Sequence, residues 1–178
     1  SILDNLLPAA VVSRPHGIEL RYVLKRELLA DPCLDIAGRR LPNHYVRRDS
    51  GDPAEVVAVR ALAHGLGAKD GVLIYPEGTR ATAARRATAI ERISKSDSTR
   101  AARMSALQHC LPPRLGGPLA LLDEAPDADV VLLAHAGLDG FKGASSALDG
   151  SLIGRRIAVQ LVRVPRSAIP SDSEGEWL

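Results

Sequence analysis

Short apolar runs alternate along the chain with segments whose apolar residues recur at helical spacing. The runs have the length and composition of β-strands, and several are continuously apolar, as in a sheet that is covered on both faces. We expect strands at residues 19–25, 44–47, 71–75, 130–135 and 157–164. The alternation predicts an α/β fold with a mostly parallel sheet that is covered by helices on both faces.

Helices are expected over residues 53–66, after Arg80, and over residues 99–110. The first is the clearest, because Asp52 is a good N-cap, Pro53 occupies the first helical position and Glu55 resembles the partner residue of a capping box. Its predicted apolar stripe comprises Val56, Val59, Leu62, Ala63 and Leu66.

Length and composition fit one domain that spans residues 1–178, since no repeat or shift of composition divides the chain. The longest apolar runs, such as residues 6–12, are too short to cross a bilayer. Cys33 and Cys110 form no metal-type spacing with the five histidines and predict no disulfide framework. We therefore expect two inert thiols and no metal.

The formal net charge is only +2, but residues 80–103 carry seven cations and two carboxylates, a local charge of +5. Such a run is most often a solvated helical face. It is also a candidate contact for phosphate, anionic lipid or nucleic acid. Because aromatic residues make up only 3% of the chain, single-stranded nucleic acid is disfavoured.

The candidate chemistry lies where the predicted strand 71–75 ends. Pro76 cannot continue a central strand, and Glu77, Gly78, Thr79 and Arg80 follow it. Gly78 allows positive φ or a close approach to a ligand, and Thr79 can cap the helix that follows. Arg80 offers a bidentate fork for phosphate. In parallel sheets, reactive groups gather at such strand ends.

The hexapeptide at 75–80, Tyr-Pro-Glu-Gly-Thr-Arg, closely resembles the Phe-Pro-Glu-Gly-Thr-Arg block of the glycerolipid (lysophospholipid) acyltransferase family. Residues 45–48 resemble the Phe-Ile-x-Arg block that precedes it in this family, with Arg48 in place of its arginine. Residues 130–135 occupy the place of the last, apolar block, but Ala134 stands where the family usually has proline. The resemblance spans residues 1–164.

The family's first block is a His-x-x-x-x-Asp catalytic pair, and residues 1–4 resemble its end. Asp4 would be its aspartate, so the histidine would lie two residues before Ser1 and the 178 residues alone would be inactive. Ser1 and Asp4 also fit a helix capping box. A rival pair, His44 and Asp49, has the same spacing, but it leaves no arginine block before Glu77 and falls on a predicted strand.

The resemblance implies an O-acyltransferase that moves a fatty acyl group from acyl-CoA or acyl carrier protein to a lysophospholipid hydroxyl, without a cofactor. Asp4 and Glu77 would be catalytic, with Glu77 orienting an arginine or the acceptor hydroxyl. The acceptor would be bound by Arg48, Gly78, Thr79 and Arg80, and Lys25 is a further candidate for binding the same anion.

The same resemblance implies phospholipid biosynthesis at the cytoplasmic face of a membrane, as a peripheral enzyme or one anchored through other segments, with an anionic surface and no nucleic acid as partner. The alternative is a non-catalytic lipid-binding relative that uses the basic face of residues 80–103. A nucleotide-binding enzyme is disfavoured because Gly65 and Gly67 precede a strand and no phosphate-binding loop motif occurs. A serine hydrolase is disfavoured because no Gly-x-Ser-x-Gly motif occurs.

Overall fold

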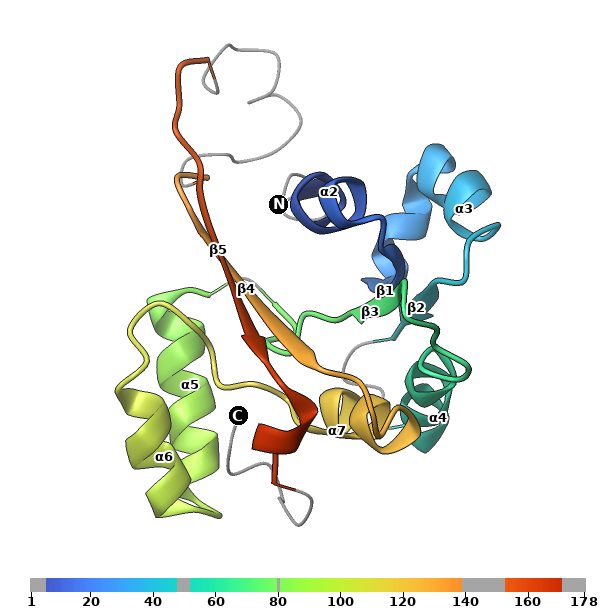
Figure 1. Cartoon of the computed structure of the whole chain (residues 1–178). Helices are drawn as coiled ribbons and strands as arrows, with labels where there is room; N and C mark the ends of the chain where they lie inside the picture. The colour runs from blue at the N-terminus through green and yellow to red at the C-terminus, as the bar shows by residue number, and fades with distance from the viewer. Residues whose placement is uncertain (1–5, 48–51, 80, 139–152, 171–178) are drawn as a thin grey trace.

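The computed structural model (Figure 1) describes residues 6–47, 52–79, 81–138 and 153–170 of the chain. Its central element is a three-stranded parallel sheet with the strand order β2–β1–β3. These strands span Glu19–Lys25 (β1), His44–Val46 (β2) and Asp70–Leu73 (β3). The first strand has the predicted limits, and the other two begin and end within two residues of them. Because the strands are parallel, their carboxyl ends lie at one edge of the sheet.

Helices connect the strands of this sheet. A π-helical turn, η1 (Ala9–Ser13), and the short α2 (Arg14–His16) precede β1, and η2 (Arg26–Ala30) and α3 (Pro32–Gly38) lead from β1 to β2. The helix α4 (Pro53–Ala61) leads from β2 back across β1 to β3. In Figure 1, α3 lies above the three strands and α4 lies below them. The chain is therefore mixed α/β, with a small parallel sheet between helices.

The helix α4 starts as predicted but ends earlier. The Asp52 side chain accepts a hydrogen bond from the Ala54 backbone N–H at 2.9 Å, as an N-cap does. The predicted helix over residues 53–66 is too long, because α4 stops at Ala61. The Arg21 guanidinium from β1 donates hydrogen bonds to the carbonyls of Leu62 and His64, both at 2.9 Å. These two carbonyls are satisfied from outside the helix, so the next turns need not be α-helical.

The remaining helices of the described structure form two pairs. The helices α5 (Ala83–Ser94) and α6 (Ser98–Ser105) form a hairpin, and α7 (Gly116–Glu124) packs beside α4 (Figure 1). Val59 of α4, Ala63 just after it and Ala120 of α7 are buried. Of the predicted stripe, Val59 and Ala63 thus lie in the core, whereas the side chain of Val56 remains 42% exposed.

The last two strands do not join the parallel sheet in the part of the chain that the structure describes. β4 (Val130–Ala136) and β5 (Ala158–Val164) pair with each other in antiparallel register, and a 3₁₀ turn, η3 (Arg166–Ala168), follows. The prediction of one mostly parallel sheet is therefore wrong for these two strands. Continuous apolar runs indicate strands but do not encode pairing direction, and here they form a separate two-stranded ribbon.

Candidate functional site

The sheet topology singles out one place for ligand binding. β1 lies between β2 and β3, so the chain leaves β1 toward one side and later returns to its other side. In open parallel sheets ligands bind at such a switch point, in the crevice outside the carboxyl ends of the strands. Here the switch point lies between the ends of β1 and β3. Residues 74–79 leave β3 at this place.

Residues 75–78 form a tight turn at the end of β3. The Gly78 N–H donates a hydrogen bond to the Tyr75 carbonyl at 3.0 Å, and Pro76 occupies the second position of the turn. Gly78 has φ +72°, which confirms the positive φ expected from its place in the motif. An alanine there would be strained, and its Cβ would lie 3.2 Å from Arg114 Nε.

Residues 110–114, which are distant in the sequence, form hydrogen bonds with this turn. The Leu111 N–H donates a hydrogen bond to Glu77 Oε2 at 3.2 Å, and the Arg114 N–H donates to the Pro76 carbonyl at 2.8 Å. Leu111 is only 4% exposed, so the bond that reaches its backbone lies at the margin of the core. Glu77 was expected to orient an arginine or an acceptor hydroxyl, and the structure shows a backbone partner that this prediction did not include.

Thr79 does not cap the helix that follows it. It was expected to cap the following helix, but α5 begins at Ala83, and Thr82 Oγ1 accepts the hydrogen bond from the Arg85 backbone N–H at 3.3 Å. Thr79 Oγ1 instead accepts a hydrogen bond from the Arg85 guanidinium at 2.9 Å. The capping prediction failed because α5 begins later in the chain, and Thr82, whose backbone is extended, is its N-cap.

Two arginines that the sequence analysis did not select therefore lie at the turn. Arg85 bonds Thr79, and the Arg114 side chain lies beside Gly78. The place of Arg85 could have been predicted locally, because it follows the capping Thr82 by three residues and so lies in the first turn of α5. The place of Arg114 beside the turn could not have been predicted locally, since Arg114 is 36 positions from Gly78 in the sequence. Both bring positive charge to the residues that precede Arg80.

The remaining predicted site residues divide into two groups. Lys25 ends β1 at the same edge of the sheet as the turn, because β1 and β3 are parallel and Tyr22 lies opposite Leu73. Asp4, Arg48 and Arg80 lie outside the described residues, so the structure does not test their predicted roles. Of the seven predicted residues, the structure thus describes four and brings Glu77, Gly78 and Thr79 together in one turn.

The rival histidine has a different environment. His44 starts β2, and its Nε2 lies 3.0 Å from Glu55 Oε2 of α4, with both side chains less than a third exposed. Glu55 Oε1 also accepts a hydrogen bond from the Arg47 N–H at 3.2 Å, so the carboxylate predicted to complete a capping box instead ties α4 to β2. His44 therefore has a structural partner of its own. Asp49, the other member of the rival pair, lies outside the described residues.

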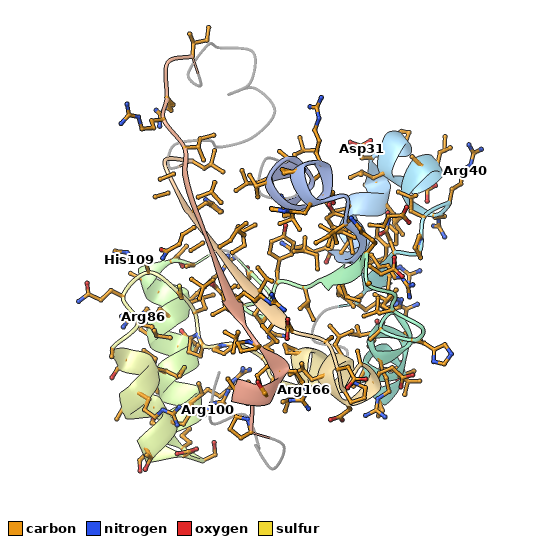
Figure 2. The ribbon with its side chains drawn as sticks, in the orientation of Figure 1. Asp31, Arg40, Arg86, Arg100, His109 and Arg166 are labelled. Carbon is orange, nitrogen blue, oxygen red and sulfur yellow. The ribbon has the colours of Figure 1, made fainter. Side chains whose placement is uncertain are left out.

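Several cations of the basic stretch 80–103 hold the helical hairpin in place. Arg86 donates a hydrogen bond to the Ser105 carbonyl across the hairpin, and Arg100 donates to the Pro113 carbonyl at 3.1 Å. Figure 2 shows both arginines on the α5–α6 hairpin. Lys95 pairs with Glu91 at 3.4 Å on the outer surface of α5. The predicted basic face is thus partly occupied by contacts within the protein.

Cys110 lies next to the site but is not activated as a nucleophile. Burial and the nearby Glu77 carboxylate both raise the pKa of its thiol above 9.0. The thiol is therefore protonated at neutral pH, whereas nucleophilic cysteines are thiolates.

In the described ranges no helix is long and apolar enough to span a bilayer, and no three His, Cys, Asp or Glu side chains gather as metal ligands would. Comparisons of the chain with protein-family models, with curated proteins and with solved structures find no match.

Proposed function

We propose that the protein is an O-acyltransferase that moves a fatty acyl group from acyl-CoA or acyl carrier protein to the free hydroxyl of a lysophospholipid such as 1-acylglycerol 3-phosphate. One observation carries the proposal. The segment that resembles the family's Pro-Glu-Gly-Thr-Arg block lies directly after β3, at the switch point of the parallel sheet. In α/β proteins this is where ligand-binding loops lie.

The charge around the turn supports a phosphate-bearing acceptor. Arg85 and Arg114 lie against Thr79 and Gly78, and Lys25 ends the neighbouring strand at the same edge. In the proposal Arg80 and Arg48 complete this group and hold the phosphate through bidentate hydrogen bonds. Fixing the phosphate would place the free hydroxyl of the acceptor at the base. The translational and rotational entropy needed to align the reactants would then be lost on binding and not in the chemical step, which lowers the barrier.

The proposed reaction needs a base and an orienting carboxylate. A histidine two residues before Ser1 would take the proton of the acceptor hydroxyl while its oxygen attacks the thioester carbonyl. The tetrahedral intermediate would then collapse, the C–S bond would break, and the thiolate leaving group would take the proton from the imidazolium. Asp4 would hold the imidazole in the required tautomer and stabilise its charged form, as carboxylates do in such dyads.

Glu77 has two roles in this proposal. Its Oε2 holds the Leu111 N–H and so fixes the turn against residues 110–114. Its negative charge would orient an arginine or the acceptor hydroxyl. The two roles are separable, because a glutamine can accept the Leu111 hydrogen bond but carries no charge.

The acceptor is an amphiphile, so the reaction would take place at a bilayer surface. We accordingly place the enzyme at the cytoplasmic face of a membrane, in phospholipid biosynthesis, as a peripheral protein or one held by other segments.

The test is acyl-CoA-dependent conversion of 1-acylglycerol 3-phosphate to phosphatidate by the protein that includes the residues before Ser1, detected by mass spectrometry. We expect Asp4→Asn, Glu77→Gln and Arg80→Gln to lower kcat/KM at least about 100-fold. The matched controls are Glu91→Gln and Arg92→Gln on the exposed surface of α5, which should keep parental activity.

The competing outcome is also informative. A protein that binds lysophospholipid vesicles but forms no phosphatidate would be a non-catalytic lipid binder, and the acyltransferase proposal would be wrong. Full activity of Glu77→Gln and Arg80→Gln would equally contradict it, because the 75–80 segment would then carry no chemistry.

A further inference from the structure

The α5–α6 hairpin is attached to the candidate site at two points. From α5, the Arg85 guanidinium donates a hydrogen bond to Thr79 Oγ1 at 2.9 Å, directly after the turn. From α6, Arg100 Nη2 donates to the Pro113 carbonyl at 3.1 Å, within the segment 110–114 that bonds the turn. Each helix of the hairpin thus supplies one arginine to the surroundings of the turn.

The segment 110–114 is stiff because it contains two consecutive prolines. Pro112 and Pro113 hold their φ angles at about −65° and have no N–H to donate. Within this short stretch the N–H groups of Leu111 and Arg114 form the two backbone hydrogen bonds to the turn. Pro113 lies between these two donors, so a displacement of its carbonyl would move both of them.

Arg100 reaches this carbonyl from a well-fixed part of α6. The backbone N–H of Arg100 donates a hydrogen bond to Oδ1 of the capping Asp97 at 2.8 Å. On the inner face of α6, Ala101 and Met104 are each only 6% exposed. Because the backbone of α6 is fixed by this cap and by its buried face, the guanidinium of Arg100 (Figure 2) acts on Pro113 from a rigid element.

From these contacts we infer that the α5–α6 hairpin positions the turn at residues 75–78, with Arg100 as the positioning residue. Arg100 does not touch the acceptor. It holds the Pro113 carbonyl, and thereby keeps the Leu111 N–H on Glu77 and the turn in the geometry that the acceptor needs. The link to the acceptor rests on the proposed function, whereas the effect on the turn does not.

The basic stretch 80–103 has an internal use in this arrangement. Three of its seven cations, Arg85, Arg86 and Arg100, donate hydrogen bonds to oxygen atoms of the protein. A guanidinium donates through several N–H groups at the end of a long side chain. A lysine at position 100 would keep a donor of similar reach, whereas a methionine would keep apolar bulk and no donor.

The kinetic test uses the protein that includes the residues before Ser1, with acyl-CoA and 1-acylglycerol 3-phosphate as substrates. Arg100→Met should raise the KM for 1-acylglycerol 3-phosphate by about tenfold and leave the KM for acyl-CoA unchanged, because only the acceptor contacts the turn. Arg100→Lys should return the acceptor KM to within about threefold of the parent. A purely structural role would lower kcat through the folded fraction and change neither KM.

A second readout does not need acyl transfer. Amide hydrogen exchange of the 178-residue chain, followed by NMR, reports how often the Leu111 N–H leaves Glu77. Arg100→Met should speed exchange at Leu111 by about tenfold, while exchange at Val59 in the core of α4 should not change.

Arg92→Met is the matched control for both readouts. It removes the same kind of side chain from the exposed surface of α5. Both KM values and the exchange at Leu111 should equal those of the parent.

The two readouts separate failure of the inference from failure of the proposed function. An unchanged acceptor KM in Arg100→Met, unchanged exchange at Leu111, or an equal effect of Arg92→Met would overturn the inference and leave the proposed function standing. Faster exchange at Val59 as well would mean that Arg100 stabilises the whole fold, which would also overturn it. No turnover by the parent would overturn the proposed function and the link to the acceptor, while the exchange at Leu111 would still decide whether Arg100 positions the turn.

Discussion

Replacing Glu77 separates the structural role of the 75–78 turn from its proposed chemical role. Glu77→Ala removes the acceptor of the Leu111 N–H, which lies at the margin of the core. A partly buried donor left without a partner costs about 1–3 kcal/mol. Glu77→Gln keeps an oxygen at the same place, and only the charge assistance of the bond is lost. We expect a destabilisation of about 2 kcal/mol for alanine and less than about 1 kcal/mol for glutamine.

The assay is urea unfolding followed by circular dichroism. The free energies of unfolding are compared for variants whose dependence on urea concentration, the m-value, is the same. Glu91→Ala is the control, since Glu91 is an exposed residue of α5 that pairs only with Lys95 among the contacts described, and it should change stability by less than about 0.5 kcal/mol. Equal destabilisation by Glu77→Ala and Glu77→Gln would refute the reasoning, because the hydrogen bond to Leu111 would then contribute nothing measurable.

Two further predictions concern backbone strain and pH. Gly78→Ala and Gly65→Ala should each lower the free energy of unfolding in urea by about 1–2 kcal/mol, because both glycines have positive φ. Only Gly78→Ala, whose Cβ would displace Arg114, should also lower the proposed acyl transfer, and equal activity of the two variants would contradict the proposed site. The Arg166 backbone N–H and the Arg163 guanidinium lower the pKa of Asp129 below 3.8. Its stabilising effect should therefore be complete above pH 3.8 and be lost as the pH falls through the lower folded-state pKa. The Asp129→Asn variant should accordingly unfold at a lower urea concentration than the parent at pH 6, and the difference between the two midpoints should shrink toward pH 3. A difference that does not change with pH would show that the charge of the carboxylate does not stabilise the fold.

The strands and the turn could be predicted because their signals are local. The strand-like segment 19–25 gave the limits of β1 to the residue, and Pro76 and Gly78 marked a turn with positive φ. What failed depended on contacts between distant residues. The end of α4 is set by Arg21, which reaches carbonyls 41 and 43 positions away.

The residues that surround the candidate site could not be predicted from the sequence for the same reason. Leu111 reaches Glu77 across 34 positions, and no periodicity in the sequence links these two segments. The pairing of β4 with β5 was missed because apolar runs look alike whether a strand is parallel, antiparallel, covered or exposed. The sequence pattern thus located the turn of the candidate site, while tertiary contacts decided which groups surround it.

The most direct test of the proposed function is the rate of phosphatidate formation from acyl-CoA and 1-acylglycerol 3-phosphate by the protein extended before Ser1, compared with its Glu77→Gln variant. The account predicts turnover by the parent and at least about a 100-fold lower kcat/KM for the variant, at nearly unchanged stability. No turnover by the parent, or equal turnover by the two proteins, would contradict it.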